Sequence, residues 1–191
     1  MHDVIVIGAG PAGALAATIL SRAKLDTLVI DADKGITRRA FVPNLLGFPD
    51  GLPGPELMNL ARRQTEKSGA QLVKAQAISL DKTTEGFVVQ TEDGTRHVAK
   101  EILLATGSAF DLASKAGAEM RPGTEPYVKE VAVVDRDGRT SVPGIWAAGT
   151  IAGVSVHVAV TAGDGARVAI NLVSTRNGSR WVDHEMMPTG A

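Results

Sequence analysis

Four short apolar runs along the chain are candidates for buried strands. Each run is four to six residues long. Strands covered on both faces show continuous apolar runs, whereas strands with one exposed face alternate apolar and polar residues. We therefore expect buried strands, of the kind found in parallel sheets, at Asp3–Ile7, Asp26–Asp31, Glu101–Thr106 and Ile145–Ala148.

A second pattern, in which apolar residues recur three and four positions apart or Ala and Leu dominate, predicts helices. In Gly54–Ser68, one face carries Leu57, Leu60 and Ala61, and Gly69 follows as a stop signal. The other segments predicted as helices are Ala12–Ala23, Leu112–Ala116 and His157–Ser174, the last of which is ended by Arg176-Asn177-Gly178.

Three further segments predict a small antiparallel β-meander. They are Gln71–Leu80, Phe87–Thr91 and Thr95–Ala99, with a hairpin turn at Asp93-Gly94 between the last two. Tyr127–Val134 is predicted as another strand, and Ala32–Pro53 as a long loop of the kind that often carries function. Together these elements predict an α/β fold with a mainly parallel sheet, flanking helices and the small meander.

The first predicted strand and helix are joined by a glycine-rich turn, Gly8-Ala9-Gly10-Pro11-Ala12-Gly13, which has the GxGxxG pattern of dinucleotide-binding folds. In such a turn Gly8 permits the bend, Gly10 lets the backbone approach a pyrophosphate, and Gly13 lets the helix pack on the strand. The start of the helix, at Pro11 and Ala12, would offer a partial positive charge and the free N–H groups that follow Pro11 to the phosphates. The strand–turn–helix–strand context therefore favours a nucleotide site over a plain turn.

An acidic residue closes this unit. Asp31 lies 18 residues after Gly13, at the end of the second strand, where a carboxylate can accept hydrogen bonds from the hydroxyls of an adenosine ribose. Ala32 and Asp33 follow and are expected to line the same adenosine pocket. The alternative is that these carboxylates are solvated groups at a strand end.

Composition narrows the chemistry further. The 191 residues include 20 basic and 21 acidic residues and form no basic stripe, so nucleic acid is not an expected partner. No apolar run is long enough to cross a bilayer and no signal peptide is evident, so we expect no membrane span and a cytoplasmic protein. These residues include no cysteine, so redox chemistry would require a bound cofactor. We interpret Asp183-His184-Glu185 as part of a polar tail, and predict no metal site.

Five stretches, in order, resemble the flavin domain of low-molecular-weight thioredoxin reductases and their relatives in the pyridine nucleotide-disulphide oxidoreductase family. They contain a glycine-rich first turn, a GF…GPEL segment, an ATG strand end, a PG…AAG strand and a last helix with two glycines. The stretches are Val4–Ala17, Pro43–Ala70, Ala99–Ser108, Thr140–Thr150 and Ala162–Val173. The resemblance implies a Rossmann-like FAD-binding fold, FAD as the cofactor, and a homodimer.

The resemblance also implies where FAD would be held. The ATG element would lie beside the ligand, the loop 34–44 would border the isoalloxazine ring, and the last helix would point its N-terminus at the flavin, where it favours negative charge on the reduced ring. The residues placed at the cofactor in this way are Asn44, Ala77, Ala105, Thr106, Gly107, Gly149, Thr150, His157, Val158 and Ala159. For Asn44 a turn residue, and for His157 a surface or cap residue, remain the alternatives.

Three departures from the family pattern bear on function. The active dithiol of the family is missing. The family inserts a second dinucleotide domain after its ATG element, whereas residues 109–126 form only a short connector and no second GxGxxG or GxGxxA motif occurs in these 191 residues. Finally, Thr150 stands where the family has an Asp that accepts a hydrogen bond from the ribityl chain.

We therefore predict one FAD-binding domain over residues 1–178 and a weakly ordered C-terminal tail over residues 179–191. Three functions remain open. The first is a flavin-dependent oxidoreductase that takes electrons from free NAD(P)H, a small-molecule donor, a separate NAD(P)H-dependent reductase or a redox protein. The second is a non-catalytic FAD-binding module or partner subunit, and the third is a simple NAD- or nucleotide-binding protein. No set of side chains identifies a catalytic residue or a substrate.

Two glycines flank an acidic residue in the last predicted helix. We interpret Asp164, between Gly163 and Gly165, as a residue that faces solvent. Glycine destabilises a helix interior, so the pair predicts either a close approach of another backbone or a local break in the helix.

Overall fold

The computed structural model describes residues 1–185, and a seven-stranded sheet lies at the centre of this region. Six strands follow the order β5-β2-β1-β8-β7-β6, and β11 also pairs with β8. The strands of the sheet are β1 His2–Ile7, β2 Thr27–Asp31, β5 Gln71–Lys74, β6 Ala77–Lys82, β7 Phe87–Thr91, β8 Arg96–Leu104 and β11 Ile145–Ala147.

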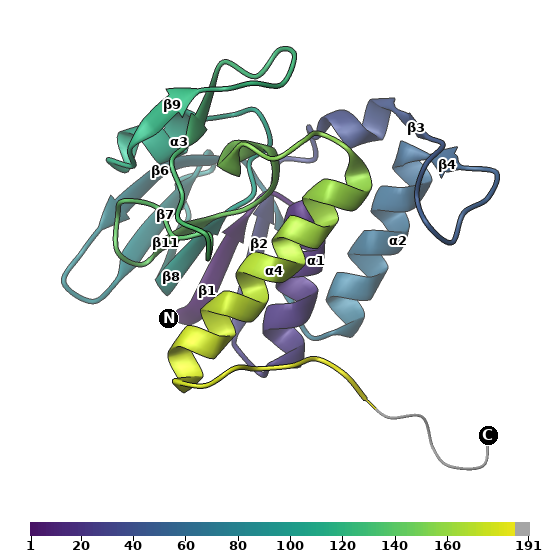
Figure 1. The fold of residues 1–191 in the computed structure, drawn as a ribbon. Helices are drawn as coiled ribbons and strands as arrows, with labels where there is room; N and C mark the ends of the chain where they lie inside the picture. The colour runs from purple at the N-terminus through teal and green to yellow at the C-terminus, as the bar shows by residue number, and fades with distance from the viewer. Residues whose placement is uncertain (186–191) are drawn as a thin grey trace.

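Four α-helices, two 3-10 turns and two small hairpins complete residues 1–185. The helices are α1 Pro11–Arg22, α2 Gly54–Lys67, α3 Asp111–Lys115 and α4 Val158–Asn177, and the 3-10 turns are η1 Ile36–Arg39 and η2 Gly149–Ala152. The hairpins pair β3 Phe41–Val42 with β4 Leu52–Pro53, and β9 Met120–Pro122 with β10 Glu130–Ala132. The predicted α/β fold, with its mainly parallel sheet and flanking helices, is confirmed (Figure 1).

Both faces of the parallel strands are covered, which explains their unbroken apolar runs. In β1, Val4 and Val6 belong to one core with the inner sides of α1 and α4, which lie side by side in Figure 1. The alternate residues Ile5 and Ile7 belong to a second core, to which β6, β7 and α3 contribute. The two-residue period of a strand thus sends neighbouring apolar side chains into opposite layers.

The strand β8 joins the parallel and antiparallel halves of the sheet. Its first residues pair antiparallel with β7, while Leu103, near its end, lies opposite Val6 of β1 on one side and Trp146 of β11 on the other, both parallel. The sequence predicted two strands here, Thr95–Ala99 and Glu101–Thr106. One continuous strand replaces them because different partners cover its two halves.

The predicted strand Gln71–Leu80 is also different in the structure. It is divided into β5, which pairs in parallel with β2, and β6, which pairs antiparallel with β7 at the opposite edge of the sheet. Only β6, β7 and β8 form the meander. Similarly, the predicted strand Tyr127–Val134 is shortened to β10, because Tyr127 has a left-handed backbone (φ 64°) and lies outside the ladder.

The long loop and the C-terminal tail contain more structure than the sequence predicted. Residues 32–53 include η1 and the β3–β4 hairpin. In the tail, the Trp181 side chain packs against the core between the sheet and α4, and Arg22 of α1 pairs with Asp183 and Glu185, each at 2.8 Å. The tail is therefore bound to the domain as far as Glu185, and its last predicted residues, 186–191, lie outside the described part of the chain.

Candidate cofactor site

The glycine-rich turn joins β1 to α1 at the carboxyl ends of the parallel strands. We call this end of the strands the carboxyl edge of the sheet, and the opposite end the amino edge. Gly8 has a left-handed backbone (φ 99°), and a Cβ there would overlap the carbonyl oxygen of Ala105. A Cβ at Gly13 would overlap the carbonyl oxygen of Gly8, whereas a Cβ at Gly10 would have no atom within 4 Å. Gly8 and Gly13 thus close the turn against its neighbours, and Gly10 faces open space that a ligand could occupy.

The helix α1 starts at this turn with no side-chain cap. Gly10 precedes it in an extended conformation, and Pro11, which has no N–H, takes the first helical position. The next N–H groups, including that of Ala12, have no partner within the helix. Such a helix end carries a partial positive charge and is suited to bind an anion such as a pyrophosphate.

Asp31 has a role at the turn that the sequence did not reveal. The backbone N–H of Ala9 donates to Asp31 Oδ1 at 3.0 Å, so the carboxylate holds the glycine-rich turn in place. An ionised carboxylate has several acceptor sites. Asp31 can therefore hold the turn and still accept a hydrogen bond from a ribose hydroxyl.

Asp33 is fixed by cations. Its backbone is left-handed (φ 59°), and its carboxylate pairs with Arg38 and, at 3.2 Å, with Lys74. Asp33 is thus an ion-paired carboxylate, and its predicted place in the adenosine pocket stays a prediction. A narrow cavity next to it is lined by Ala9, Asp31, Asp33, Arg38, Met58, Arg62, Leu72, Val73 and Lys74.

Ala32 and Ala77 are two further residues predicted at the cofactor. Ala32 follows Asp31 directly, and Ala77 is buried at the start of β6. The segment before Ala77 runs beside Asp31, because the N–H of Ala75 donates to the Asp31 carbonyl at 3.0 Å. The structure thus brings together the predicted residues of the turn and of the adenosine side.

The ATG element ends β8 directly beside the glycine-rich turn. The N–H of Ala105 donates to the carbonyl of Ile7 at 2.9 Å, which places Ala105 against Gly8. The Thr106 hydroxyl donates to the carbonyl of Ala109 at 2.5 Å, and Gly107 has φ 65°. The Thr106 side chain therefore stabilises the turn that leaves the strand.

The strand β11 ends in a second glycine turn that contacts α1. Gly149 has φ 77°, and a Cβ there would lie 2.8 Å from the Cβ of Ala12. The backbone N–H of Gly149 donates to Asp164 Oδ2 at 2.7 Å, and Thr150 follows in η2. Asp164 is only 8% exposed, so its interpretation as a solvent-facing residue is wrong.

The helix α4 is continuous across Gly163 and Gly165, so the predicted local break is absent. A Cβ at Gly165 would overlap the carbonyl oxygen of Ala12, whereas a Cβ at Gly163 would be in open space. Gly165 therefore permits the close approach of α4 to α1. Gly163 has no such packing role.

The N-terminus of α4 lies at the same edge of the sheet as that of α1 (Figure 1). His157 is its N-cap residue and provides no side-chain cap; its Nδ1 instead lies 2.7 Å from the Ser155 hydroxyl. Val158 and Ala159 begin the helix, so the predicted start at His157 is displaced by one residue. The first N–H groups of α4 are thus a second potential anion site at this edge.

Asn44 lies on a different connection of the chain from the other predicted residues. It is exposed in the connection between β3 and β4. In Figure 1 this connection projects beyond α2, away from the β1–α1 turn. Its predicted role at the flavin stays a prediction.

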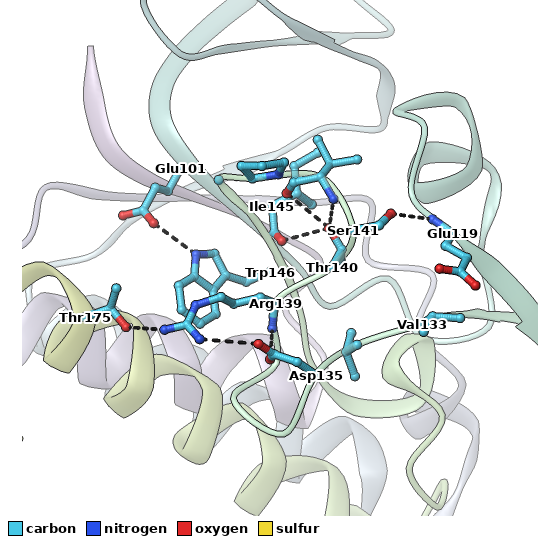
Figure 2. A pocket seen from close by; sticks show the side chains of 14 residues that line it. Glu101, Glu119, Val133, Asp135, Arg139, Thr140, Ser141, Ile145, Trp146 and Thr175 are labelled. Atoms are coloured by element: carbon cyan, nitrogen blue, oxygen red, sulfur yellow. Dashed lines mark hydrogen bonds and ion pairs between the residues drawn. The ribbon is translucent and has the colours of Figure 1, made fainter.

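A larger surface depression, of about 630 Å³, lies at a different place, next to Trp146 and Arg139 (Figure 2). The indole N–H of Trp146 donates to Glu101 Oε1 at 3.0 Å, and the Arg139 guanidinium lies over the indole ring, 4.9 Å from its centroid. Arg139 also donates to Thr175 Oγ1 at 2.7 Å. Because these polar groups already bind one another, size alone does not make this depression the better candidate for a cofactor site.

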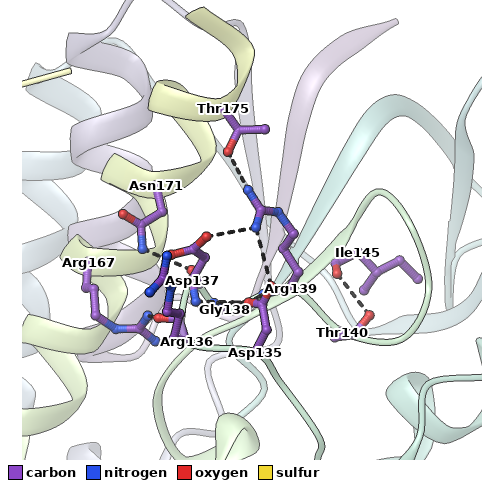
Figure 3. A network of polar contacts seen from close by, with 10 residues as sticks. All are labelled: Asp135, Arg136, Asp137, Gly138, Arg139, Thr140, Ile145, Arg167, Asn171 and Thr175. Carbon is purple, nitrogen blue, oxygen red and sulfur yellow. Dashed lines mark hydrogen bonds and ion pairs between the residues drawn. The ribbon is translucent and has the colours of Figure 1, made fainter. Parts of the chain in front are cut away.

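The turn beside this depression is held by a polar network (Figure 3). Asp135 Oδ1 accepts the backbone N–H groups of Asp137, Gly138 and Arg139, each at 2.9 Å. Burial raises the pKa of the Asp135 carboxyl, but these hydrogen bonds and the Arg139 charge outweigh it, and the net pKa is below the ordinary value. The network therefore favours the ionised form of Asp135, and this carboxylate stabilises the turn.

Neither a metal site nor a membrane span is evident in residues 1–185. No group of three His, Cys, Asp or Glu side chains in this region could hold a metal ion. None of its helices is both long and apolar enough to cross a bilayer.

Comparisons with known proteins identify the family. The model of the pyridine nucleotide-disulphide oxidoreductase family matches residues 2–132. The chain is 39% identical over 112 residues to a thioredoxin reductase of Streptomyces clavuligerus, covering 56% of this chain and 35% of that protein. It is 38% identical over 120 residues to a thioredoxin reductase of Aquifex aeolicus, covering 60% and 36%. The chain thus spans about a third of the length of these relatives.

Solved structures agree on the fold. The atypical thioredoxin reductase TRi of Desulfovibrio vulgaris Hildenborough superposes with a TM-score of 0.83 at 20% identity, covering 93% of this chain and 99% of that one. A thioredoxin reductase of Gloeobacter violaceus gives 0.82 at 18% identity, covering 97% and 99%. The family match over residues 2–132 shows that the chain belongs to the pyridine nucleotide-disulphide oxidoreductase family, with a fold like that of its thioredoxin reductases.

Proposed function

We propose that residues 1–178 form one FAD-binding domain and that the chain is a flavin-dependent oxidoreductase. The observation that carries the proposal is the carboxyl edge of the sheet, where two helix N-termini without side-chain caps, those of α1 and α4, stand next to glycine turns. FAD carries a negatively charged pyrophosphate and a flavin ring that becomes negatively charged on reduction. The positive N-terminus of α1 would bind the pyrophosphate, and that of α4 would stabilise the charge on the ring.

The residues present fit such a ligand. The open space at Gly10 would take the pyrophosphate, and Asp31 and the Ala75–Ala77 segment would border the adenosine. The Gly149–Thr150 turn and the start of α4 would contact the flavin half. Thr150 can hydrogen-bond the ribityl chain without the charge of an Asp.

A bound flavin would supply the two-electron chemistry that no side chain of this cysteine-free chain can provide. The protein groups would bind and orient it, and the positive end of α4 would favour the charge of the reduced ring. Electrons would come from free NAD(P)H, a separate NAD(P)H-dependent reductase or a redox protein, because these 191 residues hold no second dinucleotide motif. We retain the homodimer as part of the proposal.

The first test is the visible spectrum of the purified protein, with the released chromophore identified by mass. We expect about one FAD per chain, and reduction of the bound flavin by NADH, NADPH or a cell extract. Stable FAD with no reduction by any donor would favour a non-catalytic module. A colourless protein that fails to take up added FAD would contradict the proposal.

A pair of glycine substitutions makes the test specific to the site. Gly10→Ala places a methyl group in the open space of the turn, whereas Gly163→Ala places the same group in open space on α4. We expect Gly10→Ala to lower FAD affinity at least tenfold, because the backbone can no longer approach the pyrophosphate closely. Gly163→Ala should bind FAD like the unmodified protein.

A further inference from the structure

One buried charged residue, Asp164, lies next to the elements of the proposed flavin site. Asp164 is the only charged residue of residues 1–185 that is buried, and it lies in the second turn of α4. Its Oδ2 accepts the Gly149 N–H at 2.7 Å, and its Oδ1 accepts Nε and Nη2 of Arg167 at 3.0 and 2.8 Å. A buried carboxylate is costly unless it is paired and hydrogen-bonded, and Asp164 meets both conditions.

Three elements of the proposed site meet at Ala12. The Gly149 turn approaches the Ala12 side chain, and α4 approaches the Ala12 carbonyl at Gly165. A Cβ at either glycine would force these elements apart. The hydrogen bond from Gly149 to Asp164 adds a polar link from α4 to the Gly149 turn at this junction.

Arg167 connects Asp164 to a second turn. Its Nη1 donates to the carbonyl of Arg136, within the turn that Asp135 organises (Figure 3). Arg167 therefore both balances the charge of Asp164 and fixes its orientation. Both carboxylate oxygens of Asp164 are engaged, so the side chain acts on the site through Gly149.

We propose that Asp164 is a positioning residue for FAD. By holding the Gly149 N–H it fixes the Gly149–Thr150 turn against the N-terminus of α1, so the pyrophosphate and the flavin half of the cofactor meet a preformed surface. This inference rests on the proposed FAD site and adds a residue that does not itself touch the cofactor.

The test compares Asp164→Ala and Asp164→Asn with Asp111→Ala, which alters an exposed acid on α3. In the protein without added FAD, Asp164→Ala should speed hydrogen exchange at the Gly149 amide. With FAD, it should lower affinity on the order of 10- to 100-fold, since a hydrogen bond to a charged group is lost, and should change the fine structure of the flavin absorption band. Asp164→Asn should recover part of both properties, because its side-chain oxygen still accepts a hydrogen bond.

Unchanged FAD affinity and an unchanged flavin spectrum in Asp164→Ala, even with a lower melting temperature, would show a purely structural role and overturn the inference. If Asp164→Ala does not fold, Asp164→Asn and Arg167→Gln decide: a weaker, spectrally altered FAD complex in both supports the inference, and normal complexes overturn it. Failure of the unmodified protein to bind FAD would overturn the proposed function and this inference together. The unmodified protein thus distinguishes the two failures.

Discussion

The two edges of the parallel sheet satisfy their polar groups in opposite ways. At the amino edge, Asp3 accepts Lys100 Nζ at 2.9 Å and Arg176 Nη2 at 2.8 Å, and Glu101 accepts the indole of Trp146 and Arg176 Nη1, both at 3.0 Å. At the carboxyl edge, glycine turns and two helix N-termini without side-chain caps leave backbone N–H groups available. The polar groups of the amino edge are thus bound by its own side chains, whereas the carboxyl edge leaves the backbone N–H groups at which we propose that the cofactor binds.

This difference separates stability from binding within one sheet. Ligands of open α/β sheets bind outside the carboxyl ends of the strands, where the turns can change without disturbing the core. The depression beside Trp146 has more volume, yet three of its charged residues, Glu101, Asp135 and Arg139, are already held in ion pairs or hydrogen bonds. We therefore expect substitutions at the amino edge to alter stability alone, and those at the carboxyl edge to alter cofactor binding.

The largest expected effect is at Gly13. Gly13→Ala would overlap the carbonyl oxygen of Gly8 and push α1 away from β1, which should lower the free energy of unfolding by about 3 kcal/mol and abolish FAD uptake. Urea unfolding followed by circular dichroism measures the first effect, and flavin absorbance measures the second.

Gly10→Ala is the matched control within the same turn. Its methyl group would meet no protein atom within 4 Å, so the free energy of unfolding should change by less than about 0.5 kcal/mol while FAD affinity falls. Equal stability losses in the two variants would contradict the division of roles among the glycines.

The second effect belongs to the amino edge. Trp146→Phe removes the N–H that binds Glu101 and leaves part of a buried site unfilled, so we expect a loss of about 2 kcal/mol in the free energy of unfolding. FAD affinity should stay within twofold of the unmodified protein. A large loss of FAD affinity together with normal stability would mean that this depression, and not the glycine-lined edge, takes part in binding.

The local parts of this architecture could be predicted from the sequence. The glycine turn, α1, α2 and the buried strands follow from patterns within a few residues, and their predicted bounds agree with the structure to within one or two positions for β1, β2 and α1. The partner of β5 could not be predicted in this way. It pairs with β2, whereas its neighbour in sequence, β6, pairs with β7, and such pairing depends on the whole sheet.

Asp164 shows the same limit at the site. An acid between two glycines gives no local sign of burial, and only the approach of Gly165 to α1 and the turn at Gly149 encloses it. One available signal was the cost of two helix glycines, which predicts close packing on that face. The link of Asp31 to Ala9 was hidden for a similar reason, since it joins two residues of different elements.

The smallest expected effect concerns acid stability at the amino edge. Hydrogen bonding with Lys100 holds the pKa of the Asp3 carboxyl below its ordinary value, with further lowering from the Asp26 backbone and the Arg176 charge. A lowered pKa in the folded state means that Asp3 stabilises the protein above about pH 4 and that this contribution is lost as the pH falls further. Asp3→Asn should therefore cost less than about 1 kcal/mol at pH 7, and the difference from the unmodified protein should shrink between about pH 4 and pH 2 in urea titrations. Because the carboxyl edge does not depend on this group, FAD affinity at pH 7 should be the same in both proteins; a difference there would show that the two edges are coupled.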